Sequence, residues 1–295
     1  MLIRKVKGDT YIIDTGFQVI PFFKLDTGKI IMVDCGLLDE REGIVNLLAS
    51  EGLKPSAILA THAHTDHIEN AAFFQKEFGV PIIMTEVEAA VLDSPLGLKT
   101  YFYTMSVSDI MKHYNNMVVK ADTKIGMRDE NVDILGAGFR IIMTPGHSPG
   151  HISVVTPDNV ACLGDALASL DVLNNSKMMF SHTISRDIES KRNLFELEAD
   201  KYVVSHKGVF DEIRSLIQPN IDYLEASANM ILDLIEVPIG FEELYERVTK
   251  HHVIRVRDLK RYYMMERMIR PLIEYLIDTG RLRCSVDEGR LYYIK

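Results

Sequence analysis

The segment THAHTDH (61–67) holds three histidines and one aspartate within six residues. Imidazole nitrogens and carboxylate oxygens are ligands that zinc, iron and manganese share. His62 and His64 stand two residues apart after an apolar run, where an extended chain points both rings to one side. Asp66 and His67 follow where the chain turns into a helix, so they face a different direction. The spacing therefore predicts ligands for two neighbouring metal ions.

Three more candidate ligands lie at or just after the ends of apolar, strand-like runs, namely His147, Asp165 and His206. Open α/β sheets form their sites at the carboxyl ends of their strands. We therefore expect one metal site built from His62, His64, Asp66, His67, His147, Asp165 and His206. Three histidines would hold one divalent ion, Asp66 with two histidines would hold the other, and Asp165 would bridge them. Zn²⁺ is the expected metal, with iron or manganese as alternatives.

The elements that must position these ligands alternate between strand-like and helical patterns. The strand-like runs are 10–14, 18–26, 29–34, 57–62, 81–85, 139–144, 159–164 and 201–206. Helical patterns lie between several of them, at 41–52, 69–79 and 189–199. This order predicts an α/β fold with a mixed sheet and helices packed outside it.

The sequence becomes mostly helical from Pro219 onwards, which predicts a catalytic domain over 1–217 and a second domain over 218–295. Three helical segments precede two strand-like runs joined by a turn signal, an order typical of a winged helix. The third segment, 257–280, contains Pro271, which should break or kink its helix.

The candidate ligands and their surroundings resemble the metallo-β-lactamase superfamily over residues 1 to about 217. The matching motifs follow that family's order: VDCG (33–36), HxHxDH (62–67), PGHSPGH (145–151), GDA (164–166) and SHKG (205–208). The resemblance implies an αββα sandwich with a dinuclear metal site, followed here by a small winged-helix-like domain.

The resemblance also implies how the ligands divide between the ions. It assigns His62, His64 and His147 to the first ion, Asp66, His67 and His206 to the second, and Asp165 to both. Asp34 would be a carboxylate that orients a ligand histidine.

Two ions that share a water lower its pKa towards neutrality. We therefore expect a metal-bound hydroxide to attack an ester, thioester, lactone or phosphodiester bond, with Asp66 holding the hydroxide and handling its proton. Asp165 stands where zinc β-lactamases carry cysteine, which argues against antibiotic hydrolysis. His64 stands where flavo-diiron proteins carry glutamate, which argues against reduction of oxygen or nitric oxide.

Two alternative activities share parts of this pattern. Persulfide dioxygenases carry HxHxDH with a single iron, and lactamase-like endoribonucleases carry a winged-helix tail and cleave single-stranded RNA. The segment 253–270 holds six basic residues, but a solvated helix face is the simpler interpretation. Most of the acidic excess lies before residue 219 and disfavours nucleic acid, so a small molecule is the expected substrate. The C-terminal segment would close one side of the cleft or form a homodimer contact.

The composition fits a globular protein of 295 residues, with 47% hydrophobic residues and a net charge of −9. No apolar run is long enough to suggest a signal peptide or a membrane span, so no membrane partner is expected. Cys35, Cys162 and Cys284 are too scattered for a disulfide framework, which favours a cytoplasmic location.

Overall fold

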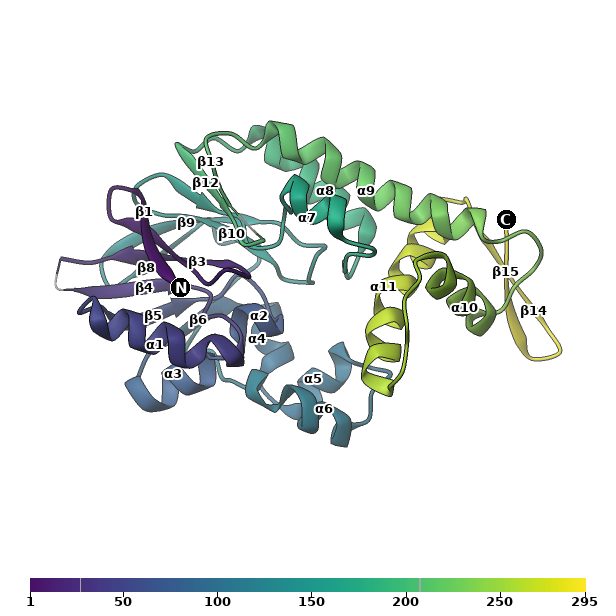
Figure 1. The fold of residues 1–295 in the computed structure, drawn as a ribbon, viewed down its shortest axis with the longest axis horizontal. Coiled ribbons are helices and arrows are strands. Elements are labelled where there is room, and N and C mark those ends of the chain that lie inside the picture. Colours follow the sequence, from purple (N-terminus) through teal and green to yellow (C-terminus); the bar gives the residue numbers. More distant parts are fainter. Residues whose placement is uncertain (27, 207) are drawn as a thin grey trace.

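The computed structural model describes residues 1–26, 28–206 and 208–295, so Lys207 of the SHKG motif lies outside the described residues. Two β-sheets lie face to face with helices outside them (Figure 1). The first sheet has the strand order β1 (Leu2–Lys7), β2 (Thr10–Asp14), β3 (Val19–Lys24), β4 (Lys29–Val33), β5 (Lys54–Leu59), β6 (Ile82–Thr85), β7 (Thr123–Ile125). The second has the order β13 (Gly208–Phe210), β12 (Lys201–Val204), β11 (Val160–Cys162), β10 (Ile152–Val155), β9 (Ala137–Met143), β8 (Asn131–Ile134).

The helices lie between and after these strands. Those of the first half are η1 (Leu38–Glu40), α1 (Arg41–Ser50), α2 (Thr65–Ile68), α3 (Ala71–Phe78), α4 (Glu86–Leu92), α5 (Pro95–Tyr101), α6 (Val107–Tyr114) and η2 (Asn115–Met117). The second half contains α7 (Leu170–Asn175), α8 (Ile184–Asn193), η3 (Leu194–Glu196), α9 (Arg214–Asp233), α10 (Phe241–His251) and α11 (Leu259–Asp278), then the ribbon of β14 (Arg283–Asp287) and β15 (Arg290–Ile294). Within the described residues, no helix has both the length and the apolar character that a membrane span requires.

Apolar packing forms three layers in this sandwich. Residues of both sheets meet in the middle core, among them Ile31 of β4 and Phe139 of β9. A second core lies between the first sheet and helices that include α1, α3 and α5, and a third lies between the second sheet and helices that include α8 and α9. Residues along β4 alternate between cores, with Ile30 and Met32 facing the helices and Ile31 and Val33 facing the other sheet. The predicted αββα fold is confirmed.

The C-terminal helices extend the core of the second sheet. Val204 of β12, Ile221 of α9 and Ile269 of α11 belong to one buried cluster, which also contains Tyr293 of β15. A β-bridge joins Tyr293 to Ile239, which ties the ribbon to the helices. The C-terminal helical region and its ribbon are therefore present, while the winged-helix assignment and the boundary between 217 and 218 stay predictions.

Three helices differ from their predicted bounds. The helix predicted over 189–199 is α8, which begins five residues earlier at Ile184. α9 begins at Arg214 and continues through Pro219, and α11 continues through Pro271. A proline removes one helical hydrogen bond, but burial of one face of each helix in the core offsets that loss. Of the two predicted effects of Pro271, a break or a kink, the break does not occur.

Candidate metal centre

The ligand segment lies where β5 meets the first helical turn after it. β5 ends at Leu59, and His62 and His64 occupy the loop that follows it. Asp66 and His67 belong to α2, which begins at Thr65, so they point in other directions than the loop histidines. The local geometry thus separates the two pairs as their spacing predicts.

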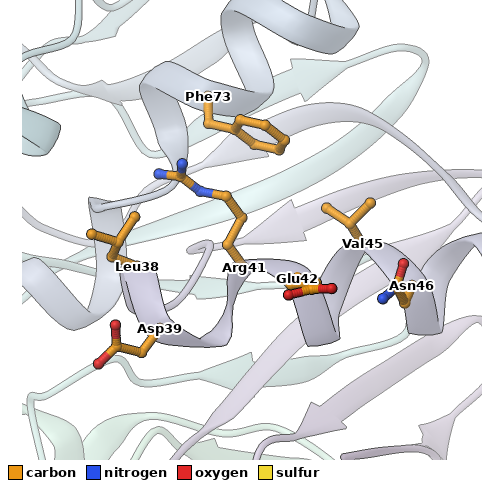
Figure 2. Close-up of a pocket in the computed structure, with 7 residues that line it drawn as sticks. All are labelled: Leu38, Asp39, Arg41, Glu42, Val45, Asn46 and Phe73. Atoms are coloured by element: carbon orange, nitrogen blue, oxygen red, sulfur yellow. The ribbon is translucent and has the colours of Figure 1, made fainter.

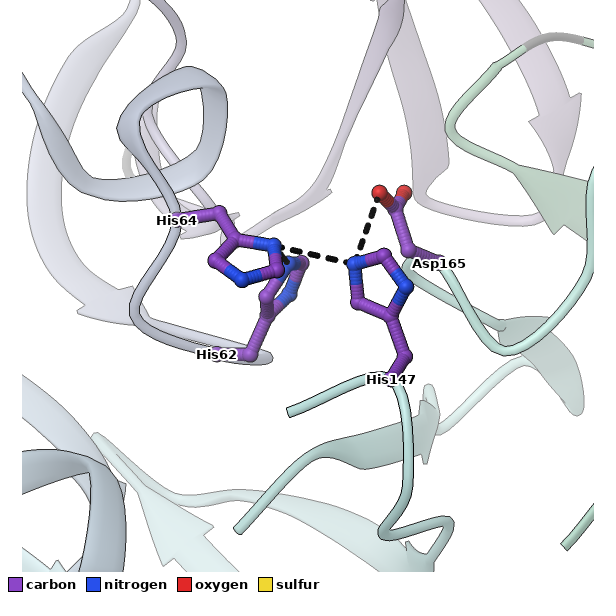
Figure 3. Close-up of side chains that lie close together, drawn as sticks. All are labelled: His62, His64, His147 and Asp165. Carbon is purple, nitrogen blue, oxygen red and sulfur yellow. Dashed lines mark hydrogen bonds and ion pairs between the residues drawn. The ribbon is translucent and has the colours of Figure 1, made fainter. Parts of the chain in front are cut away.

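The structure brings all seven predicted side chains together in two groups that share one residue. The first group is His62, His64, His147 and Asp165, and the second is Asp66, His67, Asp165 and His206. Within each group the donor atoms lie within 4.8 Å of one another, which is close enough to hold a metal ion. Figure 3 shows the side chains of the first group converging, with His62 and His64 on one loop and His147 and Asp165 on others.

The first group is dominated by neutral imidazoles. Nδ1 of His64 lies 2.9 Å from Nε2 of His62 and 2.9 Å from Nε2 of His147, which lies 3.3 Å from Oδ2 of Asp165. Ligands around a tetrahedral zinc ion are separated by about 3.4 Å, given bonds of about 2.1 Å. Burial lowers the pKa of His62, His64 and His147 below the usual value, and neighbouring histidines lower it further. These rings are therefore in the uncharged form that binds metals.

The second group combines histidines with carboxylates. Oδ2 of Asp66 lies 2.9 Å from Nε2 of His206, and Oδ1 of Asp165 lies 3.3 Å from Nε2 of His67. Burial alone would lower the pKa of His67, but Asp165, Asp34 and Asp66 raise it well above its usual value. The Nε2 of His67 and the Oδ1 of Asp165 are buried without a hydrogen-bond partner among the described residues. A cation between these atoms would satisfy both, so the donor set fits a metal ion.

Asp34 orients two of the candidate ligands from behind. Its Oδ2 accepts hydrogen bonds from Nδ1 of His67 at 2.7 Å and from the hydroxyl of Thr61 at 2.8 Å. Because that hydroxyl donates to Asp34, it accepts from Nδ1 of His62, 2.9 Å away, which leaves Nε2 of His62 bare for a metal. Asp34 also has a φ of 67°, a left-handed conformation that is rare outside glycine and frequent at functional sites.

His151 supports the site without joining either group. Its Nε2 accepts the backbone N–H of Asp165 at 3.1 Å, and its Nδ1 lies 2.8 Å from the hydroxyl of Thr144. Gly164 lies directly beneath this ring with a φ of 53°, and a Cβ there would lie 2.7 Å from Nε2 of His151. The glycine of the GDA motif is therefore required both for its backbone conformation and for space.

Glu88 of α4 joins the two ligand loops, and sequence reasoning missed it. Its carboxylate is fully buried and accepts hydrogen bonds from the N–H of Ala63 at 2.8 Å, the N–H of Gly150 at 2.6 Å and the hydroxyl of Ser148 at 2.7 Å. Burial raises the pKa of Glu88, and these three hydrogen bonds oppose the rise. One signal in the sequence could have found it. Glu88 lies four residues before Leu92, so this charged residue shares a helical face with an apolar residue.

We expect Glu88→Ala to lower the free energy of unfolding by about 3 kcal/mol, because three buried donors lose their acceptor. Metal affinity should fall as well, since the loops that carry His62 and His147 lose their shared anchor. Denaturant unfolding and metal titration measure the two effects. Glu86→Ala is the matched control, because Glu86 lies in the same helix and is exposed. Equal stability of the two variants would contradict this role.

Comparison with known proteins agrees with this geometry. The sequence model of the metallo-β-lactamase superfamily matches residues 1–206, which is more than half of the chain. The chain belongs to the metallo-β-lactamase superfamily. Together with the two groups of candidate ligands, this match supports a metal-dependent hydrolase.

Curated relatives of this superfamily member share little identity with it. It is 22% identical over 303 residues to glyoxylase B2 of Dictyostelium discoideum, covering 94% of this chain and 95% of that protein. It is 25% identical over 186 residues to hydroxyacylglutathione hydrolase of Erwinia tasmaniensis, covering 60% of this chain and 57% of that protein.

Two solved structures resemble the superfamily member over nearly its whole length. A metallo-β-lactamase family protein from Thermus thermophilus aligns with 97% of this chain and 99% of its own, at a TM-score of 0.72 and 20% identity. A β-lactamase domain protein from Burkholderia ambifaria aligns with 99% of this chain and 93% of its own, at a TM-score of 0.67 and 18% identity. The shared fold therefore includes the C-terminal helical region.

An aromatic segment at the end of α5 reaches the metal centre, although its sequence alone predicts no structure. The hydroxyl of Tyr101 lies 2.6 Å from Nε2 of His64. When Nε2 of His64 donates its N–H to this hydroxyl, Nδ1 of His64 carries no proton and is free to bind a metal. The guanidinium of Arg267, from α11, lies 4.6 Å from the centre of the Tyr101 ring. A residue of the C-terminal region thus contacts a residue that touches a candidate ligand.

A cavity of about 470 Å³ opens above the two ligand groups. It is lined by Phe17, His64, Thr65, Asp66, Phe102, Tyr114, Met117, His147, Asp165, Met178, Met179, Phe180, His206, Met264, Arg267 and Met268. Another depression, of about 510 Å³, lies on α1 and α3, and Figure 2 shows Arg41 of its wall beneath the ring of Phe73. None of the candidate ligands lines that depression, and Arg41 already donates to Asn70, so it offers no comparable chemistry.

Proposed function

We propose that this protein is a dinuclear metal-dependent hydrolase that cleaves an ester, thioester or lactone bond of a small molecule. The observation that carries the proposal is the position of Asp165. Its Oδ2 faces His147 of the first group, while its Oδ1 faces His67 and lies 3.7 Å from His206 of the second. A carboxylate in this position can bridge two ions.

Two divalent cations, with zinc first and iron or manganese as alternatives, would supply Lewis acidity and an activated water. Asp66 lines the cavity beside them. Burial opposes its ionisation, but His67 and His206 hold the pKa of this carboxyl below its usual value. Asp66 is therefore a carboxylate that can orient the attacking water and accept its proton.

The cavity favours acyl substrates over nucleic acid. Arg267 is the only lysine or arginine among its described lining residues, and a nucleic acid needs several cations along its backbone. The similarity to a hydroxyacylglutathione hydrolase adds support for a thioester.

The proposal is tested by metal analysis of protein purified without added metal, followed by a substrate screen. We expect close to two zinc, iron or manganese ions per chain. We also expect hydrolysis of thioesters, esters or lactones that a chelator abolishes and added metal restores. One tightly bound iron with oxygen consumption on glutathione persulfide would establish the dioxygenase alternative. Cleavage of short single-stranded RNA alone would establish the endoribonuclease alternative.

A further inference from the structure

The wall of the cavity above the metal centre is mostly apolar. Five of its lining residues are methionines, Met117, Met178, Met179, Met264 and Met268. Four more are aromatic, Phe17, Phe102, Tyr114 and Phe180. The carboxylates on the wall are Asp66 and Asp165, which both belong to the ligand groups. Outside the metal centre, the lining residues that the structure describes are therefore mostly apolar, and Thr65 and Arg267 add polar groups.

One side of this wall comes from α11, and its position is fixed. Met264, Arg267 and Met268 lie three and four residues apart, so they share one helical face. The guanidinium of Arg267 lies 4.3 Å from the ring centre of Phe102 and 4.7 Å from that of Phe180. The opposite face of α11 is buried in the core. The C-terminal region therefore forms part of the cavity wall and positions Met264 and Met268 there.

Phe17 is an apolar lining residue of the cavity that is not buried in the hydrophobic core. Phe17 is 56% exposed, and its ring lies edge-on to that of His206, with 5.2 Å between the ring centres. Because Phe17 lines the cavity, its ring continues the apolar wall beside this candidate ligand. Methionine side chains adapt to differently shaped apolar groups, and the cavity volume is in the range of small-molecule sites.

We propose that the substrate of this hydrolase carries a hydrophobic acyl group, of medium-chain length or aromatic, which the methionine wall binds. The inference rests on the proposed function and names its substrate class. Burying a methylene in such a cavity contributes about a fourfold gain in affinity when burial is complete. Longer acyl chains should therefore be better substrates until the cavity is filled.

The first experiment measures kcat/KM of the metal-loaded protein on acetyl, butanoyl, hexanoyl and octanoyl thioesters of N-acetylcysteamine. We expect kcat/KM to rise about threefold for each added methylene. Calorimetry with acetamide and octanamide, which are uncharged and hydrolyse slowly, gives a second readout on loaded and metal-free protein. We expect octanamide to bind both forms and acetamide to bind neither measurably.

Two variants locate the effect on the wall. Met264→Gln and Met268→Gln keep the size of the side chain but add an amide, so the octanoyl-to-acetyl ratio of kcat/KM should fall about tenfold. Leu259→Gln is the matched control, because Leu259 lies in the same helix and is 64% exposed. It should leave the ratio unchanged.

The outcomes separate this inference from the proposed function. Equal kcat/KM for acetyl and octanoyl thioesters would overturn the hydrophobic acyl group and leave the hydrolase standing. If no acyl thioester, ester or lactone is cleaved by the metal-loaded protein, the proposed function is wrong. Octanamide binding then decides the inference: no binding, or binding that Met264→Gln leaves intact, overturns it.

Discussion

Asp165→Asn should lower the rate of hydrolysis by about a thousandfold or more and reduce the metal content from near two ions per chain to one or none. The reason is that each carboxylate oxygen of Asp165 faces a different group of candidate ligands. Oδ2 faces His147 and Oδ1 faces His67, and an amide can present only one oxygen to these groups. The other position would then carry an NH₂ group, which cannot bind a metal. Steady-state kinetics and metal analysis of the same preparation measure both effects.

The control for this prediction is Asp171→Asn, because Asp171 is an exposed aspartate of α7, the next helix in the chain. It should keep full activity and metal content. An Asp165→Asn protein that is folded, holds two ions and turns over at the rate of the control would show that Asp165 does not bridge a metal pair. Circular dichroism of both variants separates loss of the site from loss of the fold.

The convergence of the candidate ligands could be predicted from the sequence because their placement depends on local patterns. Each candidate ligand follows a strand-like run, and the strands themselves are marked by apolar residues, such as KIIMV in β4. Parallel pairing of β4 with β5 and of β11 with β12 then brings strand ends to one edge. Strand patterns and this pairing rule therefore predict where the candidate ligands meet, and no knowledge of contacts between distant segments is needed.

The residues around the ligands could not be predicted, because their roles depend on contacts between segments far apart in the chain. Glu88 acquires its role from loops 25 and 62 positions away, which contain Ala63 and Gly150. Tyr101 and Arg267 meet across 166 residues, and neither stands in a recognisable motif. The strand β10 was also missed, because a run of four residues after His151 has too little length to show a period.

The C-terminal helices show the same limit. Helical periodicity predicts the order of these helices. It does not predict that α11 approaches the α5–α6 pair, as Figure 1 shows (α11 in yellow-green). The ammonium group of Lys260 lies 5.6 Å from the ring centre of Tyr114, and Arg267 lies among three aromatic rings. Basic residues of α11 therefore contact aromatic rings of the catalytic region, an interaction that the sequence interpretation as a solvated helix face did not include.

Asp34→Ala should lower the free energy of unfolding by about 3 kcal/mol or more and weaken metal binding. Three buried donors would lose their acceptor: the N–H and hydroxyl of Thr61 and the Nδ1–H of His67. Alanine at a φ of 67° adds about 1 kcal/mol of backbone strain. Denaturant unfolding of metal-free protein isolates this structural part, because no metal contributes to it.

The metal-dependent part follows from the orientation of two rings. Without Asp34, Nδ1 of His67 loses its hydrogen-bond acceptor. Nδ1 of His62 depends on Asp34 through the Thr61 hydroxyl, so its role as a donor is no longer fixed either. Both rings can then turn away from the metal sites. Asp34→Asn tests this separately, since asparagine tolerates the left-handed backbone but has one oxygen and no charge. It should restore part of the stability and little of the metal affinity. Asp39→Ala, at an exposed position, should match the unmodified protein in both measurements. If Asp34→Ala also matched it, the carboxylate would have no part in orienting the ligands.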